Sequence, residues 1–190
     1  MGRNYEALHH IQIQLSEYDK GLSHAIQRLF NILDQKEESQ GCVIVNIISA
    51  LIFKKYGIEP EIHLGEVITD GEHEAYHCWL TIEGKIFDMG IYGNSNFNPY
   101  YYGEKLKWPV ILEENTSLQY KDGTNDPVVN NWFFRLSEMP VTQYIKECPK
   151  DMLRKWYLRA MDISETVENK EKIYELSKGM AFPEICSQIK

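Results

Sequence analysis

Residues 40–57 read QGCVIVNIISALIFKKYG, and this stretch decides how the rest of the chain is expected to fold. From Val43 to Phe53 it is apolar on nearly every side, and its Lys-Lys-Tyr-Gly ending is typical of a helix C-terminus. Its β-branched residues are also compatible with a strand, but the run is long for one. We therefore predict a central, mostly buried helix that begins at Cys42.

Two segments after this helix have the pattern of strands. Residues 61–68 read EIHLGEVI, and residues 77–88 read HCWLTIEGKIFD, in which the Glu-Gly pair is a plausible two-residue hairpin turn. A turn at that position makes His77 the diagonal neighbour of Asp88 on one face, within reach of a hydrogen bond. The same register places five apolar residues on the opposite face, as expected of a core: Cys78, Leu80, Ile82, Phe87 and Met89.

Cys42 is the candidate nucleophile because it stands at the expected N-terminus of the buried helix. The positive end of the helix dipole and the unpaired N–H groups there favour the reactive thiolate. The backbone N–H of Cys42 is a candidate oxyanion donor, with Gln40 or Gln35 as a side-chain donor. Asn46, one turn further on, needs a polar partner, either in the site or in a nearby loop. Free cysteines are often only small buried hydrophobes, so the assignment depends on the His–Asp pair.

Together these residues resemble the core of the transglutaminase-like cysteine superfamily, which has a papain-like fold and includes bacterial transglutaminase-like proteases and arylamine N-acetyltransferases. The leader peptidases of lasso-peptide maturation are the members whose core most resembles residues 40–92. In these families a Cys opens the core helix, a His starts a strand, often as His-x-Trp, and an Asp lies on the next strand. The resemblance implies Cys42 as nucleophile, His77 as general base and acid, and Asp88 as the residue that orients the imidazole. Trp79 matches the tryptophan of His-x-Trp.

Residues 73–77 read HEAYH, which also matches the HExxH signature of zinc metallopeptidases. In that alternative, His73 and His77 bind the metal from one helical face, and Glu74 lies beside the metal-bound water. The flanking sequence instead favours a rim loop at His73 and Glu74 that leads into a strand at His77. The candidates for a third ligand, none of which stands out, are Glu104, Glu113 and Glu114.

The rest of the chain predicts one α+β domain over residues 1–190, built around this core. Apolar residues at steps of three and four indicate one or two N-terminal helices within residues 5–35. Residues 140–190 are expected to be mainly helical. The expected strands lie at about 61–69, 77–83, 85–91, 109–113, 117–121 and 131–136, with a long loop at 91–109. The predicted architecture is a central helix packed on a small antiparallel sheet, with extra helices at both ends.

Composition and charge restrict the expected partners. The chain has 190 residues, a formal charge of −8 and 43% hydrophobic residues. An acidic chain without a basic patch is not expected to bind nucleic acid. No apolar run is long enough to span a bilayer and no secretory signal is visible, so no membrane association and a cytoplasmic location are expected. The four cysteines lack CxxC spacing, which favours reduced thiols. No metal or other cofactor is expected.

The leading hypothesis is a cysteine-dependent acyl-transfer enzyme acting on a peptide, a protein, or a small amide or thioester. Hydrolysis of a peptide or protein amide is favoured, and transfer to an amine stays open. A non-catalytic transglutaminase-like binding module is the alternative from another functional class, since a fold does not fix a function. The zinc metallopeptidase is the third hypothesis. The substrate and the oligomeric state are open at this point.

Overall fold

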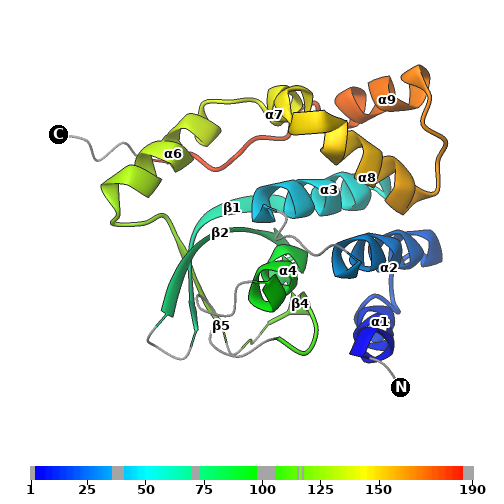
Figure 1. The fold of residues 1–190 in the computed structure, drawn as a ribbon, viewed down its shortest axis with the longest axis horizontal. Coiled ribbons are helices and arrows are strands. Elements are labelled where there is room, and N and C mark those ends of the chain that lie inside the picture. The colour runs from blue at the N-terminus through cyan, green and yellow to red at the C-terminus, as the bar shows by residue number, and fades with distance from the viewer. Residues whose placement is uncertain are drawn as a thin grey trace.

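The computed structural model describes residues 3–35, 41–69, 73–97, 106–114, 116 and 118–185. Its helices are α1 (Arg3–Gln14), α2 (Lys20–Asp34), α3 (Cys42–Lys55), α4 (Met89–Phe97), α6 (Pro127–Ser137), α7 (Val141–Glu147), α8 (Met152–Met161) and α9 (Val167–Ser177), with a 3₁₀ turn η1 (Pro149–Asp151). Its strands are β1 (Glu61–Thr69), β2 (His73–Ile82), β3 (Lys85–Asp88), β4 (Val110–Glu113) and β5 (Leu118–Asp122). The α+β class is therefore confirmed (Figure 1).

The strands form one antiparallel sheet in the order β4-β3-β2-β1-β5, and Figure 1 shows that this sheet is curled. The predicted hairpin register is confirmed, because Leu80 pairs with Phe87 and Ile82 pairs with Lys85. Glu83 and Gly84 have φ values of 53° and 77°. Two successive positive φ values are what a type I′ turn needs, and that turn matches the twist of the strands it joins. The turn thereby fixes which face of the hairpin each side chain occupies.

Helix α3 lies at the centre of the molecule, between the sheet and the C-terminal helices (Figure 1). It contacts α2, α4, α8 and α9 as well as β2. Its side chains from Val45 to Phe53 are all buried, which explains why its sequence is apolar on every side. The predicted central helix, including its first residue Cys42, is confirmed.

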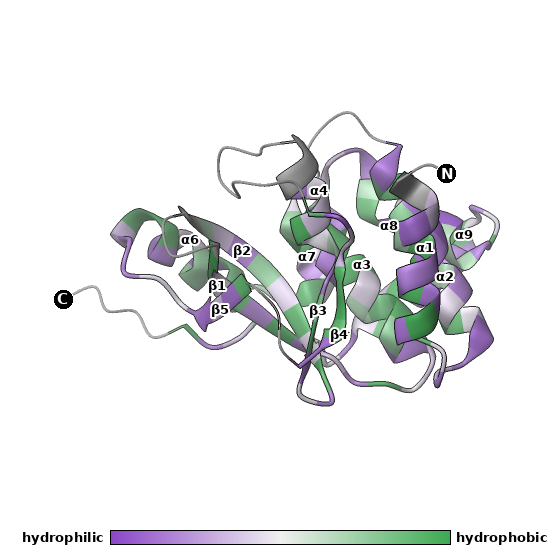
Figure 2. Ribbon diagram, turned by 90° about the horizontal axis from the view of Figure 1, so that it is seen from below, coloured by the Kyte–Doolittle hydropathy of each residue, from purple (hydrophilic) through white to green (hydrophobic). Residues whose placement is uncertain are grey.

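Helices α1 and α2 cover one side of this centre. The helix is interrupted between Gln14 and Lys20, so this region forms two helices, and the side chain of Asp19 caps α2 by accepting a hydrogen bond from the Gly21 N–H at 2.7 Å. Figure 2 shows hydrophilic and hydrophobic residues interspersed along both helices. This mixture is expected of helices that lie on the surface with one face against the core.

The five residues predicted for the apolar face of the hairpin, from Cys78 to Met89, are all fully buried in the main core. The opposite face also carries apolar residues, which the sequence did not predict. They form a second, smaller cluster of Val67, Ala75, Trp79, Ile91, Val110 and Leu118. Within the described part of the chain, none of the helices has both the length and the hydrophobicity needed to cross a bilayer.

Four predictions about individual segments are wrong. The segment predicted as a strand at 131–136 lies in α6, whose N-cap Asp126 accepts hydrogen bonds from the N–H groups of Val128 and Val129. The strand predicted at 85–91 ends at Asp88, and the predicted loop at 91–109 begins within helix α4; its residues 98–105 lie outside the described residues. Strand β2 begins at His73, where the sequence predicted a rim loop.

Candidate active site

Cys42 is the first residue of α3, and its side chain is partly exposed. The N-cap residue Gly41 has no side chain to cap the helix, although its carbonyl accepts hydrogen bonds from Ile44 and Val45. The first N–H groups of a helix have no intrahelical acceptor, and they lie at the positive end of the helix dipole. The N-terminus of α3 therefore presents N–H groups beside a partly exposed thiol, where negative charge is favoured.

His77 and Asp88 form a buried pair between the two strands of the hairpin. The His77 Nε2 atom lies 2.9 Å from Oδ1 and 2.8 Å from Oδ2 of Asp88. Both side chains are fully buried. The diagonal hydrogen bond that the hairpin register predicted is therefore present, and it leaves Nδ1 as the ring nitrogen available to a nucleophile.

Three more groups donate hydrogen bonds to the Asp88 carboxylate. They are Asn46 Nδ2 at 3.1 Å, the Ile91 N–H at 3.0 Å and the Tyr120 hydroxyl at 2.9 Å. Because Asp88 directly precedes α4, its bond to Ile91 makes it the N-cap of that helix. A buried carboxylate that accepts several hydrogen bonds is held in one orientation. Tyr120 is a site residue that the sequence did not indicate, because β5 is distant along the chain.

The charge state of His77 links Asp88 to Cys42. Burial alone would lower the pKa of His77, but the Asp88 carboxylate and then the Cys42 thiolate oppose this effect and raise the pKa from 6.5 to about 10. Cys42 lies close enough for its charge to act on the imidazole. The three predicted residues are thus brought together, in the order thiol, imidazole, carboxylate.

The other described cysteines differ from Cys42. Cys78 is fully buried, and burial is the main reason that its pKa lies well above the usual value. Burial also raises the pKa of Cys148. A raised pKa keeps a thiol protonated and unreactive at neutral pH. Cys186 lies outside the described residues.

Asn46 and Gly90 fix the distance between α3 and α4 at the site. Asn46 is fully buried, and its Nδ2 atom also donates to the backbone carbonyl of Cys78 at 2.6 Å. A Cβ atom placed on Gly90 would lie 2.9 Å from Asn46 Nδ2 and 3.0 Å from the Cα atom of Cys42. The absence of a side chain at Gly90 is therefore what allows α4 to approach the first turn of α3.

The other predicted support residues have different outcomes. Trp79 is buried and packs between His63 and Tyr120, with ring-centroid distances of 5.3 Å and 5.1 Å, so it lies on the same sheet face as His77 and contacts the tyrosine that donates to Asp88. Gln35 is exposed and accepts a hydrogen bond from Arg159 at 3.4 Å, which ties it to α8. Gln40 lies outside the described residues.

The HExxH segment is in strand β2, not in a helix. At about 3.3 Å per residue, the Cα atoms of His73 and His77 are about 13 Å apart in a strand, whereas a zinc helix brings its two histidines together over one turn. Among the described residues, no group of three or more His, Cys, Asp or Glu side chains is placed to hold a metal ion. Of the candidate third ligands, Glu113 pairs with His10 and Glu114 with Lys85, while Glu104 lies outside the described residues.

Comparison with known proteins gives no relative from which a function can be carried over. No family model, no curated protein and no solved structure matches this chain.

Proposed function

We propose that this protein is a cysteine-dependent acyl-transfer enzyme that uses Cys42, His77 and Asp88. The observation that carries the proposal is the buried His77–Asp88 pair, whose imidazole is also coupled to a partly exposed thiol at an open helix N-terminus. A positively charged imidazole beside a cysteine stabilises the thiolate, which is the nucleophilic form. Two fully buried ionisable side chains are costly to maintain, and general acid–base chemistry is a role that would account for them.

Each residue has a definite role in the proposed reaction. The Cys42 thiolate attacks the carbonyl carbon of an amide or thioester, and the carbonyl π electrons move to the oxygen. The N–H groups in the first turn of α3 are positioned to stabilise that oxyanion. As the bond to the leaving group breaks, Nδ1 of His77 donates a proton to it, while Asp88 keeps Nε2 in place. The neutral imidazole then takes a proton from an attacking water, which releases the acid and regenerates the thiolate.

Hydrolysis of a peptide or protein amide is the reaction we favour. The order of a Cys on the central helix, a His on one strand and an Asp at the end of the next is the order in transglutaminase-like cores. The proposed papain-like, transglutaminase-like assignment is supported by this order and by the position of Asn46, which ties the helix to the same carboxylate. An amine acceptor in place of water would give a transferase with the same acyl-enzyme.

The proposal is tested by trapping the acyl-enzyme. The protein is incubated with p-nitrophenyl acetate, a reactive ester, and the acetyl group is located by intact mass and peptide mapping. We expect a single acetyl group on Cys42, with formation abolished in Cys42→Ser and strongly slowed in His77→Ala. Cys148→Ser is the matched control and should acylate like the wild type. Equal acylation of Cys148 and Cys42, or no acylation of Cys42, would point to the non-catalytic binding module.

A further inference from the structure

Among the described residues, strand β1 has no strand partner on the side away from β2 beyond its pairing with β5. The two strands pair from Thr69↔Leu118 to Glu66↔Lys121, and the chain of β5 then turns away over Gly65. A Cβ on Gly65 would lie 2.0 Å from the carbonyl oxygen of Lys121, which shows how closely β5 crosses there. In the described part of the chain, residues 61–64 thus have a strand partner on the β2 side alone.

The direction of the backbone groups along this edge follows from one hydrogen bond. The Gly123 N–H donates to the Leu64 carbonyl at 2.9 Å, so Leu64 points its backbone groups away from β2. In an antiparallel strand the residue two positions away points the same way. The N–H and carbonyl of Ile62 therefore face away from β2, and no described backbone group outside the strands bonds to them. A segment lying along this edge would find both a donor and an acceptor there.

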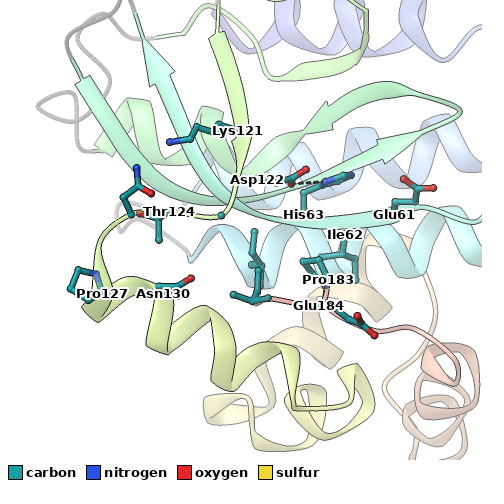
Figure 3. Close-up of a pocket in the computed structure, with 14 residues that line it drawn as sticks. Glu61, Ile62, His63, Lys121, Asp122, Thr124, Pro127, Asn130, Pro183 and Glu184 are labelled. Carbon is teal, nitrogen blue, oxygen red and sulfur yellow. Dashed lines mark hydrogen bonds and ion pairs between the residues drawn. The ribbon is translucent and has the colours of Figure 1, made fainter. Parts of the chain in front are cut away.

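A groove of about 660 Å³ runs along this edge. Figure 3 shows its opposite wall, formed by Pro127 and Asn130 of α6 and by Pro183 and Glu184 of the segment that follows α9. Figure 1 shows that segment returning between α6 and the sheet. The groove holds none of the proposed catalytic residues, so it is a separate feature of the molecule. The edge from the Cα atom of Glu61 to that of Leu64 is about 10 Å long, which suits four residues of an extended peptide.

The two sides of the edge differ in chemistry. Ile62 and Leu64 point to the apolar side, which belongs to the main core. Glu61 and His63 point to the other side, where His63 Nδ1 lies 2.9 Å from Oδ1 of the exposed Asp122. A strand added here would therefore alternate between an apolar and an acidic environment, because successive side chains of a strand point to opposite faces.

The charges on the groove favour a cationic occupant. Three exposed carboxylates line it, at Glu61, Asp122 and Glu184. Lys121 is the single lysine or arginine among the described lining residues. Its Nζ atom lies 2.9 Å from Oε2 of the buried Glu66. The carboxylates thus exceed the available positive charge, and a lysine or arginine in the occupant would balance them.

We infer that this groove binds an extended polypeptide segment of alternating basic and apolar residues, which adds a strand to this edge of β1. Main-chain hydrogen bonds to Ile62 supply affinity in this mode of recognition, and the alternating environments supply specificity. The inference does not depend on the proposed chemistry of Cys42, because no residue of the groove takes part in that site.

The test uses a fluorescein-labelled peptide, acetyl-(Lys-Val)₃-amide, and measures its binding by fluorescence anisotropy. Two isomeric N-methylated forms of this peptide are compared with it. In one isomer the backbone nitrogens of the three lysines are methylated, and in the other isomer those of the three valines, so each isomer lacks every second backbone N–H donor. In an added strand, just one of these sets faces β1, so we expect one isomer to bind at least about ten-fold more weakly than the other. Equal behaviour of the two isomers, or no binding of the parent peptide, would overturn the inference.

Two protein variants locate the binding. Glu184→Gln should weaken binding about two- to five-fold, as expected for an exposed ion pair. Glu171→Gln, at an exposed position of α9 away from the groove, is the matched control and should bind like the wild type. Amide NMR shifts on titration should be largest at Ile62, Leu64 and Gly123. Shifts centred on another part of the sheet, or an equal effect of the two variants, would contradict this location.

Discussion

The carboxylate of Asp88 accepts hydrogen bonds from groups on β2, α3, α4 and β5. The His77 and Asn46 side chains, the Ile91 N–H and the Tyr120 hydroxyl thus converge on a single buried side chain. Through these hydrogen bonds, the positions of β2, α3, α4 and β5 affect the orientation of the His77 imidazole. A change at any of these donors is therefore expected to reach Cys42 through His77.

The sequence predicted only part of this arrangement. Cys42, His77 and Asp88 could be found because a helix start and a two-residue turn constrain residues that are close along the chain. Tyr120 could not be found, because it reaches Asp88 from a strand 32 residues away whose pairing has no local signal. Asn46 was recognised as needing a partner, but the sequence could not say that the partner is Asp88.

The stability of the protein should depend on pH through His77. The pKa of this residue is raised from 6.5 to about 10 in the folded protein, so its contribution to stability is complete below pH 6.5 and is lost as the pH rises to about 10. One proton changes the free energy of unfolding by at most about 1.4 kcal/mol per pH unit over that window. Urea unfolding of the wild type between pH 6 and pH 10 measures this slope.

Asp88→Asn is the comparison for this slope. It removes the negative charge that contributes most to raising the pKa of His77, so its stability should vary less with pH over the same window. The free energy of unfolding is measured against pH for both proteins, and the difference between the two curves cancels the contribution of unrelated titrating groups. Parallel curves for the wild type and the variant would mean that His77 is not coupled to Asp88 in this way.

Gly90→Ala should disturb Cys42 without unfolding the protein. The added Cβ would lie 3.0 Å from Cys42 Cα and 2.9 Å from Asn46 Nδ2, so the two helices must separate by some tenths of an ångström. We expect a cost of about 1–3 kcal/mol in urea unfolding and a slower alkylation of Cys42 by iodoacetamide. Gly41→Ala is the control, because nothing lies within 4 Å of a Cβ there. Equal alkylation rates in the two variants would contradict the role of Gly90.

At the scale of elements, helices α6 and α4 were not predicted from the sequence, and the reasons differ. Residues 127–137 are rich in β-branched and aromatic residues, which favoured a strand, but Asp126 followed by Pro127 is a helix start that could have been recognised. Residues 89–97 read MGIYGNSNF, and their glycines and asparagines disfavour a helix. That helix forms because Asp88 caps it and α3 packs against it, which are tertiary effects.

Gly65→Ala should loosen the pairing of β5 with β1. The carbonyl oxygen of Lys121 would lie 2.0 Å from the new Cβ, and a backbone atom can yield little. We expect a loss of about 1–3 kcal/mol, with hydrogen exchange becoming faster at Tyr120 and Lys121. Because Tyr120 donates to Asp88, alkylation of Cys42 should slow as well.

Gln119→Ala is the matched control for this variant, since Gln119 is an exposed residue of the same strand and pairs with Ile68. Its effect should stay within about 0.5 kcal/mol, as for most surface substitutions. If Gly65→Ala left the exchange rates of β5 unchanged, the tight crossing over Gly65 would be disproved.

At the scale of the whole molecule, α3 belongs to both the helical part and the sheet part of the core. The apolar pattern of residues 43–53 was sufficient to predict this position, whereas the curl of the sheet and the second apolar cluster could not be predicted. That second cluster draws residues from β1, β2, α4, β4 and β5, and such long-range pairing has no periodic signal in the sequence.

Because α3 joins the two parts, we expect the chain to unfold as one cooperative unit. Native-state hydrogen exchange should give the same opening free energy for the slowest amides of α3, α8 and β2. The Arg28 side chain, which donates to the Ala160 carbonyl at 2.6 Å, adds a direct tie between α2 and α8. A lower opening free energy for α8 than for β2 would show instead that the C-terminal helices unfold independently.

The measurement that tests the proposed thiol–imidazole–carboxylate site most directly is the rate of iodoacetamide labelling of the native protein across pH, followed by peptide mapping. We expect Cys42 to label quickly below pH 7, because the charged imidazole of His77 stabilises its thiolate, and we expect His77→Ala to abolish this fast labelling. Cys148, whose pKa is raised mainly by burial, is the internal control and should label slowly. Labelling of Cys42 that is no faster than that of Cys148 below pH 7 would contradict the proposed mechanism.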